Sequence, residues 1–265
     1  MKGRQIIFSP TGGTKKVADL LAGEWKLKRE AVDLTDPSVD FGSISVEKEE
    51  LTLIAVPSYG GRVPALAAKR FRQIKGNGAR CVIVCVYGNR AYEDTLTELE
   101  DLAEECGFEV IAAVAAIAEH SIMHQYATGR PDREDEQELK EFAEKISKKF
   151  QEEQSKGQIW EQEKRKISDF KVPGNRPYKE SAPVPMVPKA EDGCNQCGIC
   201  VKKCPAEAIS LNHVQEADEK KCISCMRCVV VCPAGARKIN AAAAAAVAQK
   251  IEKACSVRKR NELYC

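Results

Sequence analysis

The feature that most constrains this chain is a cysteine motif that occurs twice between residues 194 and 233. Each copy has the pattern C-x2-C-x2-C-x3-C-P. The two copies consist of Cys194, Cys197, Cys200 and Cys204, and of Cys222, Cys225, Cys228 and Cys232. The surrounding region of about 50 residues is too short to be stable on a hydrophobic core alone, so we expect bound metal to stabilise it.

The spacing predicts which cysteines act together. Three cysteines separated by two residues can hold three corners of an iron–sulfur cubane, and the cysteine before proline serves the other cluster. The expected ligand sets for two 4Fe-4S clusters are Cys194, Cys197, Cys200 and Cys232, and Cys222, Cys225, Cys228 and Cys204. Structural zinc is the alternative, but it uses two separated pairs and leaves the third cysteine of each motif without a role. Clusters that only stabilise the fold are a further alternative.

The chain has thirteen cysteines, and the other five show no metal-ligand spacing. They are Cys81, Cys85, Cys106, Cys255 and Cys265. Cys81 and Cys85 share one face of an expected strand, which favours buried packing over chemistry. The N-terminus leads directly into an apolar strand without a signal region, so we expect a cytoplasmic protein, in which thiols stay reduced.

Composition excludes several classes of protein. With 265 residues, 43% hydrophobic and 30% charged, the chain has the composition of a globular protein with one large or two unequal domains. A net charge of +2, without a basic tract interleaved with aromatic residues, argues against nucleic-acid binding. The longest uncharged apolar run, residues 110–118, is too short to span a membrane.

The first 150 residues alternate β-branched runs with helical patterns, which is typical of parallel strands joined by crossover helices. Strands are expected at residues 5–8, 31–34, 51–56, 81–86 and 110–117, and helices at 14–22, 65–74, 93–106 and 134–151. The predicted fold is α/β, with a doubly wound five-stranded parallel sheet in residues 1–150. A proline-rich extended linker (151–190), a small α+β domain (191–240) and a basic helix or tail (241–265) are expected to follow. The six alanines at 241–246 favour a helix that continues to about Lys259.

A turn rich in glycine and hydroxyl groups follows the first expected strand and leads into a helix. It reads S-P-T-G-G-T-K at residues 9–15. Amides at such a turn, together with a helix N-terminus, can bind an anion, although the turn matches neither the dinucleotide nor the Walker pattern. It resembles the phosphate loop of flavodoxins, which binds the FMN phosphate without an arginine. The resemblance implies phosphate binding by Ser9, Thr11, Gly12, Gly13 and Thr14, with Pro10 and Gly13 as departures.

Two further loops lie at the carboxyl ends of the third and fourth expected strands, where open α/β sheets bind ligands. Tyrosines there can stack on an isoalloxazine ring, and glycines allow close approach of the backbone. The flavodoxin resemblance implies that Gly60 or Gly88 contacts the flavin N5, while Arg62 or Arg90 offsets charge on the reduced ring. The FMN candidates in these loops are Pro57, Ser58, Tyr59, Gly60, Gly61, Arg62, Tyr87, Gly88, Asn89, Arg90 and Tyr92.

The cysteine region is similar to bacterial two-cluster ferredoxins, including P-A-E-A-I at 205–209 and P-A-G-A at 233–236. The whole chain resembles the flavodoxin–ferredoxin fusion family of anaerobic bacteria and archaea, also through Y-G-N-R-A-Y-E-D at 87–94, A-E-H-S at 118–121 and G-R-P-D at 129–132. This resemblance implies electron transfer between two 4Fe-4S clusters and FMN, with redox proteins as partners. We expect the cysteine domain to dock near the Tyr59 and Tyr87 loops of its own chain, or of a partner in a head-to-tail homodimer.

The predicted function is that of an electron-transfer iron–sulfur flavoprotein, a low-potential carrier or a reductase, in which FMN couples single electrons to two-electron chemistry. One alternative is a flavin-dependent reductase of a small organic substrate or quinone, which needs an open pocket over the ring. Another is a redox sensor or scaffold that uses the clusters as a switch. His120 and His124 are candidates for proton transfer, but ordinary loop positions explain them as well. No catalytic residue is identified from the sequence.

Overall fold

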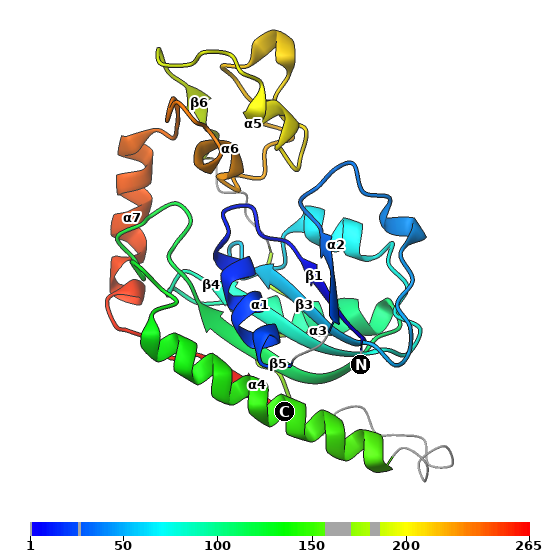
Figure 1. The fold of residues 1–265 in the computed structure, drawn as a ribbon. Helices are drawn as coiled ribbons and strands as arrows, with labels where there is room; N and C mark the ends of the chain where they lie inside the picture. Colours follow the sequence, from blue (N-terminus) through cyan, green and yellow to red (C-terminus); the bar gives the residue numbers. More distant parts are fainter. Residues whose placement is uncertain (1, 26–27, 157–170, 181–185) are drawn as a thin grey trace.

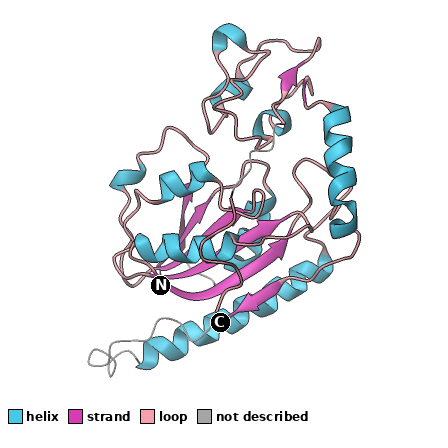
Figure 2. Cartoon of the chain, turned by 180° about the vertical axis from the view of Figure 1, so that it is seen from behind, coloured by secondary structure: helices cyan, strands magenta, loops and turns pink. Residues whose placement is uncertain are grey.

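A twisted sheet forms the larger part of the molecule in the computed structural model, which describes residues 2–25, 28–156, 171–180 and 186–265 (Figures 1 and 2). Its strands are β1 (Lys2–Ile7), β2 (Lys28–Asp33), β3 (Leu51–Pro57), β4 (Arg80–Tyr87), β5 (Glu109–Ile117) and β8 (Glu262–Tyr264). Their order is β2-β1-β3-β4-β5-β8. The first five are parallel, which confirms the predicted doubly wound sheet, and the 2-1-3-4-5 order is the flavodoxin-like one.

Helices cover both faces of the sheet. The helices are α1 (Gly13–Gly23) and α4 (Arg133–Lys156) on one face, and α2 (Ala65–Phe71) and α3 (Thr95–Glu105) on the other. Adjacent strand residues alternate between the two faces, so Ile6 packs in the α2–α3 core and Ile7 in the α1–α4 core. Because β3, β4 and β5 are buried on both faces, their sequences read as continuous apolar runs. We call this unit the sheet domain.

The end of the chain returns to the sheet domain and adds a sixth strand that the sequence analysis did not predict. Helix α7 (Ala241–Cys255) ends four residues before the expected Lys259. The side-chain nitrogen of Asn89 donates to the backbone carbonyls of Cys255 and Val257, 2.9 Å each. Its side-chain oxygen accepts a hydrogen bond from the backbone amide of Lys259. These bonds satisfy carbonyl groups at the helix terminus and turn the backbone away. Strand β8 then pairs antiparallel with the edge strand β5.

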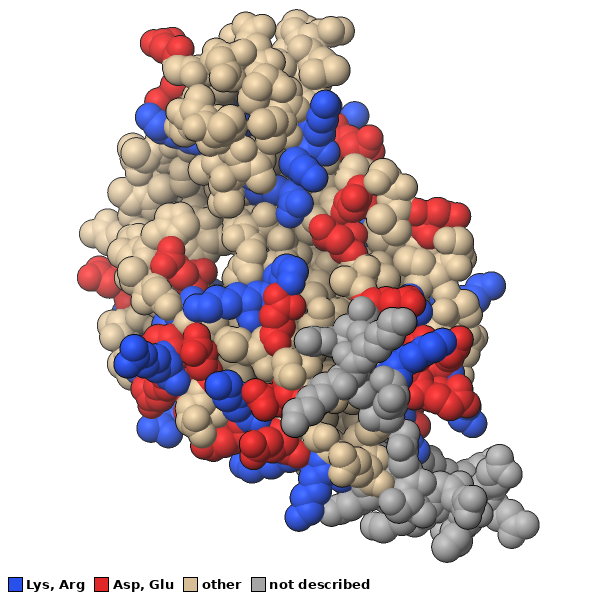
Figure 3. Space-filling model, viewed as in Figure 1, with Lys and Arg blue, Asp and Glu red and all other residues tan. Residues whose placement is uncertain are grey.

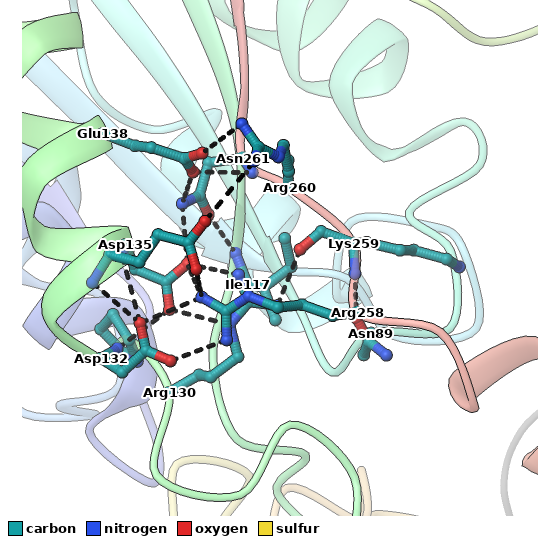
Figure 4. A network of polar contacts seen from close by, with 12 residues as sticks. Asn89, Ile117, Arg130, Asp132, Asp135, Glu138, Arg258, Lys259, Arg260 and Asn261 are labelled. Carbon is teal, nitrogen blue, oxygen red and sulfur yellow. Dashed lines mark hydrogen bonds and ion pairs between the residues drawn. The ribbon is translucent and has the colours of Figure 1, made fainter.

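A buried polar network fastens this C-terminal segment to the sheet domain (Figure 4). The side-chain oxygen of Asn261 accepts a hydrogen bond from the Ile117 amide at 2.9 Å. Its side-chain nitrogen donates to Asp135 at 3.0 Å and to Glu138 at 2.8 Å. Asp135 is also paired with the buried Arg130. One asparagine side chain thus connects the tail, the end of β5 and the start of α4.

The cysteine-rich region forms a smaller unit, residues 186–255, which we call the small domain. Its elements are β6 (Lys189–Ala190), α5 (Ile199–Lys202), η3 (Leu211–His213), α6 (Arg227–Val230), β7 (Arg237–Lys238) and α7. The two short helices are equivalent, because each begins within one cysteine motif after a left-handed residue, Gly198 or Met226. The small domain lies over the carboxyl ends of the sheet strands, and α7 runs back along the sheet domain (Figure 1).

Part of the expected linker is packed against the sheet domain. Asn175 donates through its amide and its side chain to Asp94, 2.9 Å each. Arg176 pairs with Asp101, and the Arg62 guanidinium lies 4.8 Å from the centre of the Tyr178 ring. The linker residues at 157–170 and 181–185 lie outside the described part of the chain. A helix apolar and long enough to cross a membrane does not occur in the parts of the chain that the structure describes.

The two domains differ in surface charge on the face seen in Figure 3. On that face, most of the upper lobe, which is the part of the small domain that precedes α7, is uncharged. Acidic and basic side chains are interspersed over the sheet domain below it.

Candidate functional site

The small domain contains two cavities, and each is surrounded by one of the predicted sets of four cysteines. The first, which we call the proximal cavity, is lined by Cys204, Cys222, Cys225 and Cys228. The second, the distal cavity, is lined by Cys194, Cys197, Cys200 and Cys232. The structure therefore groups the cysteine before each proline with the opposite motif. Each cavity thus has four sulfur atoms in its wall, and four thiolates are the donor set of a 4Fe-4S cluster.

Backbone amides point at several of these sulfur atoms. The Ala208 amide donates to the Cys204 sulfur at 3.3 Å. Burial raises the pKa of Cys232, but backbone amides of residues 234–237 outweigh it and lower the pKa overall. Burial raises the pKa of Cys225 to about 12 despite an amide hydrogen bond. A thiolate in so buried a place requires a positively charged partner, such as a bound metal.

The proximal cavity adjoins the sheet domain. Ile223, in its wall, packs against the α2–α3 core, and Met226, also in its wall, packs against Met123 after β5. The Arg70 guanidinium of α2 donates to the Pro205 carbonyl at 2.7 Å. The distal cavity is lined by residues of the small domain only. The small domain therefore docks on the sheet domain of its own chain, with one cavity near the sheet and one away from it.

The predicted phosphate loop is a turn in which four backbone amides have no hydrogen-bond partner among the described residues. Ser9 accepts a hydrogen bond from the Lys15 amide through its hydroxyl at 2.9 Å, and Gly12 has a left-handed φ of 96°. The amides of the intervening turn have no acceptor among the described residues; they belong to Thr11, Gly12, Gly13 and Thr14. Four such amides at the start of α1 suit a phosphate.

The loop after β3 forms a tight turn. Tyr59 and Arg62 exchange backbone hydrogen bonds, and Gly60 and Gly61 between them have φ of 62° and 85°, which favours glycine. Space is open at Gly60, whereas a side chain on Gly61 would collide with Glu93. Burial raises the pKa of Tyr59 well above its usual value, and the nearby Cys225 thiol adds to this shift. This turn therefore lies beside the proximal cavity.

Other candidates from this loop are bound within the chain. The Ser58 hydroxyl lies 2.7 Å from the Thr95 hydroxyl. The Arg62 guanidinium makes a two-point ion pair with Glu98 at 2.7 and 2.9 Å. Pro57 ends β3. Ser58 and Arg62 thus hold the turn against α3, and Arg62 also contacts the linker.

The loop after β4 mainly contacts other parts of the chain. Tyr87 is only 5% exposed and packs edge-on against Tyr92. Gly88 makes room for the His120 ring, since an added Cβ would come within 2.7 Å of it. Arg90 pairs with Glu93 at 2.9 Å, while the Tyr92 hydroxyl bonds Glu262 of the tail at 2.8 Å. With Asn89 bound to the same tail, this loop anchors the C-terminal segment.

The two histidines have different surroundings. Burial lowers the pKa of His120 to about 4, and its Nδ1 accepts hydrogen bonds from the amides of Ile122 and Met123. His124 is exposed and contacts Glu119 at 2.7 Å. Cys81 and Cys85 are fully buried in β4, as the strand pattern predicts. None of these four residues lines either cysteine cavity.

The sequence analysis missed two arginines at these sites. Arg227 lies within the second motif, and its Nη1 is 3.4 Å from the carbonyls of Ser9 and Pro10 in the phosphate loop. Arg237 is buried, with its Nη1 3.8 Å from the Cys200 sulfur. The equivalent positions of the first repeat hold Ile199 and Ile209. The sequence signal that could have identified both arginines is that the second repeat has arginine where the first has isoleucine.

Comparison with known proteins identifies the small domain. Residues 193–255 match the family model of the 4Fe-4S dicluster domain. The chain joins a flavodoxin-like domain to a 4Fe-4S dicluster domain. That is the domain composition of the flavodoxin–ferredoxin fusion family. No curated protein matches the chain.

Several solved structures are similar to the sheet domain. A flavodoxin of Streptococcus pneumonia TIGR4 is 19% identical over 56% of this chain and 99% of its own, with a TM-score of 0.41. Flavodoxin 1 of Bacillus cereus is 18% identical over 56% and 98%, with a TM-score of 0.42. Rubredoxin oxygen:oxidoreductase of Desulfovibrio gigas is 16% identical over 58% and 37%, with a TM-score of 0.44. The strand order, rather than these distant matches, supports the fold.

Proposed function

We propose that this protein transfers electrons between two 4Fe-4S clusters and an FMN, as a low-potential carrier between redox proteins. The observation that carries this proposal is the position of the proximal cavity. Its wall residues Ile223 and Met226 pack on the sheet domain, and Tyr59 of the turn after β3 lies beside its Cys225. One chain thus holds a cysteine cavity against the strand ends where a flavodoxin-like sheet binds its cofactor.

The donor sets support two clusters. Cys204, Cys222, Cys225 and Cys228 would hold the proximal cluster, and Cys194, Cys197, Cys200 and Cys232 the distal one. Amide hydrogen bonds, such as that from Ala208 to Cys204, stabilise the sulfur charge and tune the reduction potential. The third cysteine of each motif, two residues after the second, favours clusters over zinc, because structural zinc sites use two separated pairs.

The residues at the end of the sheet fit FMN. The four unbonded amides of residues 11–14 would bind the phosphate, with Ser9 holding the turn in shape. Gly60, rather than Gly88, would present its backbone to the flavin N5, because space is open at Gly60 while His120 packs against Gly88. Tyr59 would contact the ring, because it is partly exposed whereas Tyr87 is only 5% exposed.

The arrangement predicts a direction for the electron path. When bound, the clusters carry single electrons and FMN couples them to two-electron chemistry. The proximal cavity adjoins the sheet domain, whereas Cys197 of the distal cavity is exposed. A redox partner would therefore exchange electrons at the distal cavity, and the proximal cavity would connect it to the flavin.

Anaerobic purification followed by iron, sulfide and flavin analysis and a reductive titration tests the proposal. We expect about eight iron atoms, eight sulfides and one FMN per chain. A Cys197→Ser variant should lose the distal cluster and slow flavin reduction by an external ferredoxin, whereas the exposed Cys265→Ser should behave like the wild type. A colourless protein, or one that contains zinc instead of iron, would refute the proposal.

A further inference from the structure

The lysines next to the phosphate loop interact with other groups of the chain. The two lysines that follow the turn are engaged elsewhere, because Lys15 pairs with Asp19 and the Lys16 ammonium donates to the Pro131 carbonyl at 2.6 Å. An FMN phosphate carries nearly two negative charges, and the amides of residues 11–14 supply only partial positive charge. A full positive charge from another part of the structure would strengthen phosphate binding at these amides.

Arg227 of the small domain reaches this turn. Its Nη1 lies 3.4 Å from the carbonyl oxygens of Ser9 and Pro10, which is long for a hydrogen bond. Its Nε is buried and has no acceptor in the described residues. No carboxylate of those residues forms an ion pair with it. A guanidinium with a buried, unused N–H is costly unless an anion completes its bonds, and a phosphate suits its planar geometry.

We propose that Arg227 completes the FMN phosphate site, so that the flavin is bound across the boundary between the two domains. This inference rests on the proposed function, and it differs from the flavodoxin pattern, in which the loop binds phosphate without an arginine. Arg227 lies between Cys225 and Cys228, two residues that line the proximal cavity. Phosphate binding would therefore also hold the proximal motif against the sheet domain, and flavin binding would stabilise domain docking.

Comparison of FMN with riboflavin, which lacks the phosphate, isolates this contact. Affinities of both flavins are measured anaerobically by fluorescence quenching on flavin-free, cluster-loaded protein. We expect Arg227→Gln to lower FMN affinity by about tenfold or more, since charge-assisted hydrogen bonds to phosphate are lost. Riboflavin affinity should stay within about twofold of the wild type. Lys202→Gln, an exposed charge removed from the equivalent helix α5, should change neither affinity.

Equal losses for FMN and riboflavin would overturn the inference, because they would indicate that Arg227 only holds the domains together. Unchanged FMN affinity would overturn it as well. If Arg227→Gln does not load iron, Arg227→Lys replaces it, and its FMN-to-riboflavin affinity ratio should fall by about threefold because an ammonium cannot bond phosphate at two points. An unchanged ratio in that variant refutes the contact. A wild type that loads iron but binds neither flavin refutes the proposed function itself.

Discussion

The buried arginine Arg237 lies between the two cysteine cavities and should raise the reduction potentials of both clusters. Its side chain is 2% exposed, and it donates to the carbonyls of Val214 at 2.5 Å and Pro188 at 3.0 Å. Its Nη1 is 3.8 Å from the Cys200 sulfur of the distal cavity. Burial raises the pKa of Cys228 in the proximal cavity to about 11, and the Arg237 charge opposes this shift.

The magnitude follows from the charge and its distance. A positive charge favours the more negative, reduced state of a neighbouring cluster and therefore raises its potential. At about 4 to 8 Å and an effective dielectric constant of about 20, one charge contributes about 2 to 4 kcal/mol. This corresponds to roughly 90 to 180 mV for a one-electron couple. We expect Arg237→Gln to lower both cluster potentials by about 100 mV.

Redox titration monitored by electron paramagnetic resonance measures both potentials in the iron-loaded variant. Lys238→Gln is the matched control, because it removes a neighbouring charge that is 59% exposed and paired with Glu191. Water screens that charge, so its loss should move either potential by less than about 20 mV. Arg237→Lys keeps the charge and should stay near the wild type. If Arg237→Gln loads iron fully and both potentials remain within about 20 mV of the wild type, the electrostatic reasoning is wrong.

Three further substitutions test the assignment of Cys204 to the proximal cluster, the lowered pKa of His120 and the backbone strain at Gly61. Cys204→Ser should reduce iron from about eight to about four atoms per chain, with loss of the proximal cluster, as measured by iron and sulfide analysis. The unfolding free energy should fall as the pH decreases from 6.5 toward 4. The pKa of His120 is about 4 in the folded chain, so the unfolded chain binds the proton at a higher pH than the folded chain does. His120→Gln should remove about 1 to 2 kcal/mol of this loss, as measured by urea titrations at several pH values. Gly61→Ala should destabilise the chain by about 1 to 3 kcal/mol in the same assay, because the φ of 85° strains alanine and its Cβ meets Glu93.

Each of these variants has a control in the same chain. The buried Cys81→Ser should leave iron unchanged, so equal iron loss in both cysteine variants would contradict the exchanged ligand set. For the histidine the wild type is the control, and an unaltered dependence of the unfolding free energy on pH in His120→Gln would rule out that residue as its source. Gly23→Ala, where a Cβ meets nothing within 4 Å, should cost less than about 0.5 kcal/mol, and a similar cost at Gly61 would disprove the strain.

Local spacing determined the features that the sequence predicted well. Three of the five parallel strands, β3, β4 and β5, follow from apolar runs that are buried on both faces. The grouping of the cysteines follows from the spacing, since the three cysteines of each motif that are separated by two residues line one cavity. The exchange of Cys204 and Cys232 between motifs was predicted from the ligand pattern of two-cluster ferredoxins, in which the cysteine before proline serves the other cluster. The structure places the same four sulfurs around each cavity.

Tertiary structure alone decided which side chains meet across long distances in the chain. Asn89 was a flavin candidate by its position after β4, yet it holds the tail more than 160 residues away. The sequence analysis assigned no role to Arg227, and docking of the small domain brings it to Ser9. Strand β8 has three residues, too few to show a period, and it exists because the edge of β5 offers unpaired backbone groups. Such partners depend on how two domains and a tail pack, and no local pattern records that geometry.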